Sequence, residues 1–139
     1  MKKLILMLTA IFTLAFSSLC MAADGGALNK AQDSAEKFMA GFKSTPAAYT
    51  EVAGGFSNDL KSKINAQAFA ELQKQVKSQF GNVKNNKFFS YERYDQFDRV
   101  TYISNCTKED LVAFILTCDK KGRLVDFAIT KLQAEKASK

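Results

Sequence analysis

The spacing of the hydrophobic residues changes near the middle of the chain. Before Gly81, apolar side chains recur every three or four positions, first in a stripe from Leu28 to Phe42 and again from Phe69 to Phe80. This is the spacing of one face of an α-helix. After Gly81, apolar and polar residues alternate, which is the period of β-strands. The pattern therefore predicts an α+β fold in which helices precede an antiparallel sheet.

Capping residues indicate where the helices begin and end. Ser44-Thr45-Pro46 combines hydroxyl caps with a proline suited to the first helical position, which predicts a short helix from Pro46 to about Ala53. A brief helical turn is expected between Phe56 and Ile64. Asn65 is a good N-cap for the next helix, and Gly81 is placed to end it in a left-handed conformation.

Four strands are predicted in the second half of the chain, at residues 87–94, 99–106, 111–118 and 123–130. Asp119-Lys120-Lys121-Gly122 is expected to form the turn between the last two. A register with Cys118 opposite Arg123 gathers one apolar face from both strands. Its members are Val112, Phe114, Leu116, Val125, Phe127 and Ile129.

The opposite face of that hairpin is also largely apolar, with Leu111, Ala113, Ile115, Leu124 and Ala128, and with Thr117 and Asp126 among them. A sheet face in open water should carry polar residues, so either a longer helix or another subunit has to cover it. We expect a homodimer packed sheet to sheet, with Leu111, Ala113 and Ile115 in the interface.

The N-terminus resembles a secretory signal peptide. Lys2 and Lys3 precede the apolar run Leu4–Leu19, and Cys20-Met21-Ala22 supplies the small residues that a signal peptidase requires. We expect cleavage after Ala22 and a periplasmic or secreted protein without a stable membrane span. An uncleaved membrane anchor and a lipoprotein modified on Cys20 are the alternatives; Leu19 before the cysteine disfavours the lipoprotein.

Four segments follow from these boundaries: a signal peptide at 1–22, a flexible lead-in at 23–29, a single α+β domain at 30–131 and a polar tail at 132–139. The formal charge of +6 falls to +4 without the two lysines of the signal. Lysines gather between residues 61 and 87, but that stretch contains no arginine, which disfavours nucleic acid as a partner.

The chain contains no histidine. Catalytic Ser-His-Asp and Cys-His arrangements and histidine-bound zinc are therefore excluded, and no metal or other cofactor is expected. Cys106 and Cys118 are a natural disulfide candidate in an oxidising compartment. However, the predicted hairpin separates them by about 20 Å at about 3.3 Å per residue, whereas a disulfide needs Cα atoms within about 7 Å. We therefore expect both to be free thiols.

The order of elements resembles the small cystatin-like and nuclear-transport-factor-2-like domains of secreted bacterial proteins, including a large family of unknown function. The resemblance is carried by Ala35-Glu36-Lys37-Phe38-Met39, Phe56, Leu60, the helix from Phe69 to Gly81, and the segment from Phe114 to Phe127. It implies a curved four-stranded antiparallel meander wrapped around helices, with a pocket used for ligands, for isomerisation or dehydration, or for dimerisation through the sheet. The cystatin inhibitory signature Gln-x-Val-x-Gly is absent.

One cluster combines residues suited to chemistry: Tyr91, Tyr94, Asp95, Asp98 and Tyr102. An aspartate base and a tyrosine donor can move a proton beside a carbonyl if burial raises the aspartate pKa. Asp95 and Asp98 also fit a hairpin turn exposed to water. We therefore expect no catalytic residues and a non-catalytic module that binds a small ligand or an envelope protein, with Tyr91, Tyr102 and Asp95 as candidate ligand contacts. The alternative is a histidine-free enzyme of the isomerase or dehydratase type.

Overall fold

A computed structural model describes residues 25–133. The expected signal peptide at 1–22 and most of the tail lie outside these residues. The helical half contains four α-helices and two 3₁₀ turns: α1 (Gly25–Met39), η1 (Ala40–Phe42), α2 (Tyr49–Val52), η2 (Ala53–Gly55), α3 (Asn58–Lys63) and α4 (Ala66–Phe80). The part of the chain expected as a flexible lead-in is helical from Gly25 onward, so the domain begins before residue 30.

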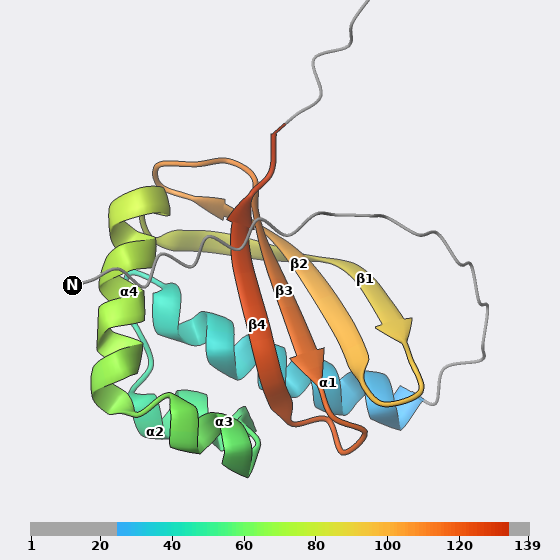
Figure 1. Ribbon diagram of the computed structural model, residues 1–139. Helices are drawn as coiled ribbons and strands as arrows, with labels where there is room; N and C mark the ends of the chain where they lie inside the picture. Colours follow the sequence, from blue (N-terminus) through green and yellow to red (C-terminus); the bar gives the residue numbers. More distant parts are fainter. Residues whose placement is uncertain (1–24, 134–139) are drawn as a thin grey trace, which may run out of the picture.

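Four antiparallel strands form one sheet in the order β1-β2-β3-β4. They are β1 (Val83–Arg93), β2 (Asp98–Cys106), β3 (Val112–Cys118) and β4 (Leu124–Lys131). The helices lie on one side of this sheet, and α1 packs across β2, β3 and β4 (Figure 1). The predicted α+β class, with helices first and a four-stranded meander after, is confirmed.

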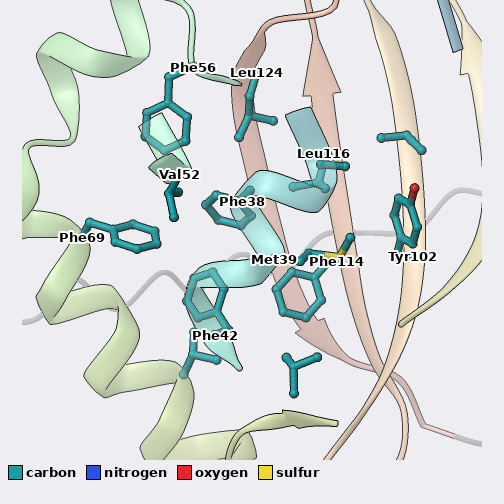
Figure 2. Packing of buried hydrophobic residues seen from close by; sticks show 14 of the residues in the cluster. Phe38, Met39, Phe42, Val52, Phe56, Phe69, Tyr102, Phe114, Leu116 and Leu124 are labelled. Carbon is teal, nitrogen blue, oxygen red and sulfur yellow. The ribbon is translucent and has the colours of Figure 1, made fainter. Parts of the chain in front are cut away.

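The core lies between the helices and the sheet and is built around Phe38. Its ring packs against phenylalanines from the helices and from β3 and β4 (Figure 2). Each such side chain contributes about 1.5–3 kcal/mol on burial, and aromatic pairs add about 0.5–1.5 kcal/mol. The other rings are Phe42, Phe56, Phe69, Phe114 and Phe127.

The predicted caps of α4 are confirmed. The Asn65 side chain accepts a hydrogen bond from the backbone N–H of Ala68 at 2.8 Å, and Gly81 ends the helix with φ +84°. A Cβ at Gly81 would collide with the side chain of Thr107, so the position requires glycine for both reasons.

The start of α2 differs from the prediction. The helix begins at Tyr49 rather than at Pro46, and Ala48 is its N-cap. The preceding residues are held by other partners, since Lys43 forms a bridge with Val83 and the N–H of Ala47 donates to the carbonyl of Ala40. These tertiary hydrogen bonds override the local helix-start signal.

The register of the β3–β4 hairpin also differs from the prediction. Cys118 pairs with Leu124 and not with Arg123, and a β-bulge at Val125 shifts the following pairs by one more residue, so that Phe114 faces Ile129. The Asp119 carboxylate accepts hydrogen bonds from the N–H groups of Lys121 and Arg123, which draws Arg123 into the turn. The bulge places Leu124 in the core, fully buried, and turns Val125 out of it.

The predicted turn at Asp119–Gly122 is confirmed, and it is fastened to α1. Gly122 has φ +83°, and its carbonyl accepts a 2.5 Å hydrogen bond from the buried hydroxyl of Ser34. A side chain at Gly122 would meet Lys30 of α1. At the other end of the sheet, the N–H of Leu132 donates to the carbonyl of Leu111, so the ordered chain continues past residue 131.

Candidate functional site

A pocket of about 300 Å³ lies between α1 and the β1–β2 hairpin. This volume is at the lower end of the range of about 300–1,000 Å³ that is typical of small-molecule sites. Tyr102 on β2 forms part of its wall, at the margin of the apolar cluster next to Met39 (Figure 2). The other lining residues are Glu36, Lys43, Lys84, Asn85 and Asn86.

The hydroxyl of Tyr102 is buried and makes no hydrogen bond within residues 25–133. The whole residue is only 5% exposed, and its ring packs edge-on against Phe88. Burial raises the pKa of Tyr102, the charge of Glu36 raises it further, and the nearby Gln32 amide opposes this without reaching hydrogen-bond geometry. An unpaired buried hydroxyl costs about 1–3 kcal/mol, so it is a feature that a bound ligand could satisfy.

The charged residues of this pocket are not paired with one another. Glu36, Lys43 and Lys84 enter no ion pair with any residue that the structure describes. The side chain of Asn86 accepts a hydrogen bond from the buried Ser104 hydroxyl, which leaves its amide group free to donate. The residues that line the pocket therefore carry one carboxylate, two ammonium groups and two amides, of which the Asn86 amide group is free to donate.

Two other members of the predicted cluster, Tyr91 and Asp98, belong to a separate hydrogen-bond network with Arg93 and Lys120. Asp98 begins β2 and is 2% exposed. Its carboxylate accepts hydrogen bonds from the Tyr91 hydroxyl at 3.0 Å, from Lys120 at 2.8 Å and from Arg93 at 3.3 Å. The Lys120 ammonium also donates to the backbone carbonyls of Tyr94 and Phe97. This network ties the β1–β2 turn to the β3–β4 turn.

The pKa shifts in this network oppose acid–base chemistry at neutral pH. Burial alone would raise the pKa of Asp98, but the hydrogen bonds from Lys120 and Tyr91 and the charges of Lys120 and Arg93 outweigh it and lower the pKa. Burial and the bond to Asp98 raise the pKa of Tyr91 to about 12. A weaker base and a weaker acid are the reverse of what proton abstraction requires, so the network fits a structural role.

Asp98 was expected to face water in a turn, and that expectation is wrong. Asp95, by contrast, is exposed in the turn between β1 and β2; its side chain takes no part in the network and does not line the pocket. Nearby, Tyr94 stacks on Phe97, and the Arg99 guanidinium lies over the Tyr94 ring at 5.3 Å. Of the three candidate ligand contacts, Tyr102 therefore lies in the wall of this pocket, whereas Tyr91 and Asp95 do not line it.

Cys106 and Cys118 lie at opposite ends of the β2–β3 hairpin. Cys118 pairs with Asp98 at one end, while Cys106 lies beyond the last pair, Ser104 with Val112, at the other. Both thiols are buried and free. Burial raises the pKa of Cys118 to about 12, with further contributions from the neighbouring carboxylates Asp119 and Asp98. Neither thiol is therefore placed or activated for nucleophilic chemistry.

The apolar side chains on the outer face of the sheet are less exposed to solvent than expected. Ala113 is 0% exposed and Ile115 is 9% exposed within a single chain, because they pack with Ala128, Ile103 and Leu132. Only Leu111, at 39%, remains accessible among the three residues assigned to a dimer interface. The most exposed large apolar side chains lie instead on the edge strand β1.

That exposed pair is Phe88 and Phe89, with Phe89 61% accessible. A bulge in β1 between Phe88 and Ser90 places Phe89 outside the regular pairing with β2.

A cluster of three or more potential metal ligands does not occur within residues 25–133. None of the helices in that part of the chain has the length and hydropathy needed to span a bilayer.

Sequence reasoning missed most of the Tyr102 pocket. Glu36 and Lys43 precede Tyr102 by more than 50 positions, and each is an ordinary charged residue on the polar side of a helical stripe. The sequence carried one signal, since Glu36 and Lys43 are seven residues apart, about two turns of an α-helix, although in the structure the helical conformation ends at Phe42 and Lys43 is extended. Their approach to Lys84 depends on the Lys43–Val83 bridge, which local patterns do not encode.

No protein-family model matches this sequence, and comparison with curated proteins and with solved structures finds no significant match.

Proposed function

We propose that this protein is an exported, non-catalytic module that binds a small polar ligand in the pocket beside Tyr102. The observation that carries the proposal is the buried Tyr102 hydroxyl, which lacks a hydrogen-bond partner next to the charged, unpaired Glu36. A fold retains an unsatisfied buried group at a cost, and binding a ligand is a common reason for such a cost. Glu36, which lines the same pocket, is exposed and enters no ion pair with the described residues.

The proposal includes a cystatin-like or nuclear-transport-factor-2-like fold. Its support is the arrangement of helices on one face of a four-stranded meander, together with a pocket between α1 and the sheet. A fold of this kind does not determine activity, so the functional part of the proposal rests on the pocket residues alone.

Export is the second part of the proposal, and it rests on the N-terminal sequence. We predict that the mature protein begins at Ala23, because the apolar run ends at a small-residue cleavage site. N-terminal sequencing or intact-mass measurement of protein from the periplasm and medium checks this. Met1 retained on membrane-bound protein would contradict it.

Ligand binding is tested by thermal shift with a library of small polar and zwitterionic metabolites. Lys84→Met removes one charge from the pocket, and Lys87→Met removes a charge from the same strand outside it. Ligands of the pocket should raise the Tm of the wild type and of Lys87→Met, and raise that of Lys84→Met much less. The proposal fails if no compound stabilises the wild type, or if every stabilising compound acts equally on Lys84→Met.

A further inference from the structure

We infer that the ligand of the Tyr102 pocket is a linear zwitterion about as long as a tripeptide. Its carboxylate lies between Lys43 and Lys84, and its ammonium group lies against Glu36. This inference rests on the proposed function and adds the chemical class of the ligand.

The basic end of the pocket is formed by two separate segments. Lys43, directly after η1, forms a parallel bridge with Val83 at the start of β1, and Lys84 follows Val83 in the chain. Val83 in turn pairs with Cys106, and the Lys84 charge acts on the Cys106 thiol. Two ammonium groups are thereby brought to one end of the pocket, and neither has a carboxylate partner in the described chain. An anionic group of a ligand is the complement to this end.

The acidic end lies one helix segment away. Glu36 precedes Lys43 by seven residues across α1 and η1, and Lys43 itself is extended, so their backbones are roughly 10–13 Å apart at about 1.5 Å per α-helical residue and about 2 Å per 3₁₀ residue. Glu36 acts electrostatically on Tyr102, which lies four residues before Cys106 on β2. That separation along the strand is about 13 Å at about 3.3 Å per residue. The helix and the strand thus both separate the backbone of Glu36 from the backbones of Lys43 and Lys84, which puts the carboxylate-bearing and ammonium-bearing residues at opposite ends of the pocket.

The middle of the pocket suits a peptide group. Asn86 keeps its amide N–H groups free because its oxygen accepts from Ser104, so it can donate to a ligand carbonyl. Met39 of α1, buried in the core, supplies an apolar part of the pocket wall. The Tyr102 hydroxyl beside Glu36 can both donate and accept.

The separation of the charges selects the length of the ligand. An extended chain spans about 3.3–3.6 Å per residue, so three residues cover about 10 Å. A free amino acid engages only one end of the pocket, and a hexapeptide exceeds its length. The volume of about 300 Å³ likewise fits a small ligand and not a long chain.

Calorimetric titration of the full-length mature protein with defined peptides tests the inference. The probes are tri-alanine, its N-acetylated form, its C-terminal amide, and hexa-alanine. We expect tri-alanine to bind, each blocked form to bind at least tenfold more weakly, and hexa-alanine to bind more weakly than tri-alanine.

Variants connect each end of the peptide to its protein partner. Glu36→Gln should weaken tri-alanine at least tenfold but leave the affinity of the N-acetylated peptide unchanged, because the acetylated end has no charge to lose. Likewise, Lys84→Met should weaken the binding of tri-alanine at least tenfold but leave the affinity of the C-terminal amide unchanged. Glu71→Gln on α4 and Lys87→Met on β1 remove equivalent charges outside the pocket and should change neither affinity.

The inference is overturned if tri-alanine does not bind, or if the acetylated and amidated peptides bind as well as the free one. In that case the proposed function can still hold, and the thermal-shift test distinguishes the two results. A different compound whose effect requires Lys84 would retain the pocket and reject the zwitterion. A screen in which no compound raises the Tm in a way that depends on Lys84 would contradict both the zwitterion and the proposed binding function.

Discussion

Replacing tyrosine by phenylalanine should have opposite effects on stability at positions 102 and 91. Tyr102→Phe removes a buried hydroxyl that has no hydrogen-bond partner among the described residues, whereas Tyr91→Phe removes a hydroxyl that donates to the Asp98 carboxylate at 3.0 Å. The two substitutions delete the same atom from neighbouring strands. Any difference between them therefore reports the surroundings of the hydroxyl.

The magnitudes follow from the two environments. An unsatisfied buried hydroxyl costs about 1–3 kcal/mol, so Tyr102→Phe should raise the free energy of unfolding by about 1 kcal/mol or more. The contact of its ring with Phe88, at 5.8 Å between centroids, is retained. Tyr91→Phe loses a hydrogen bond to a charged group, worth about 1.5–3 kcal/mol when buried and nearer 1 kcal/mol at this half-buried position. For a domain of this size, 1 kcal/mol corresponds to about 4 °C in Tm.

Urea denaturation followed by far-UV circular dichroism measures both variants against the wild type. The urea dependence of the unfolding free energy should be unchanged, so that the shift of the midpoint gives the difference directly. If Tyr102→Phe destabilises the protein as much as Tyr91→Phe does, the Tyr102 hydroxyl has a partner in solution. The pocket would then lose its principal support as a binding site.

Asp98→Ala should destabilise the protein by about 2–3 kcal/mol near neutral pH, since it removes the buried acceptor of three hydrogen bonds, while the exposed Asp95→Ala changes stability by no more than about 0.5 kcal/mol. Because folding lowers the pKa of Asp98, its contribution to the free energy of unfolding is present above pH about 4 and disappears as the pH falls through that lowered pKa. A stability difference between the wild type and Asp98→Ala that persists unchanged in acid would therefore contradict the network. Cys106 and Cys118 should react slowly with a thiol reagent in the folded protein and completely after unfolding without reductant; no reaction at all, with the monomer mass unchanged on a non-reducing gel, would show that they are bonded. A homodimer through the outer sheet face should be dissociated by Leu111→Asp at its exposed residue, and a monomeric wild type by light scattering at high micromolar concentration would show the dimer hypothesis to be wrong.

Local signals were sufficient for most of the secondary structure. The change of period at Gly81 separated helices from strands, and the Asn65 cap and the Asp119–Gly122 turn lie where the sequence predicts them. These features depend on residues a few positions apart, so the sequence contains the information directly. The bulge at Val125 does not have such a signal, because Leu124 and Val125 are equally apolar and either could face the core.

The candidate sites were harder to predict because distant residues determine them. Asp98 resembles an exposed turn aspartate until Lys120, 22 residues later, covers it. Tyr102 was identified as a candidate, but Glu36 and Lys84, which line the same pocket, come from α1 and from the start of β1. Their meeting depends on how α1 crosses the strands, which follows from packing of the whole core and not from any short motif.

An amide NMR titration of the uniformly ¹⁵N-labelled protein with the most stabilising ligand of the thermal-shift screen shows whether that ligand binds in the Tyr102 pocket. The structure offers competing hollows, one between α4 and the segment from Gly41 to Pro46, and another between Gly54-Gly55 and the β3–β4 turn. We predict that the largest chemical-shift changes occur at the backbone amides of Glu36, Asn86 and Tyr102. Largest changes centred on either competing hollow, with these three amides unmoved, would contradict it.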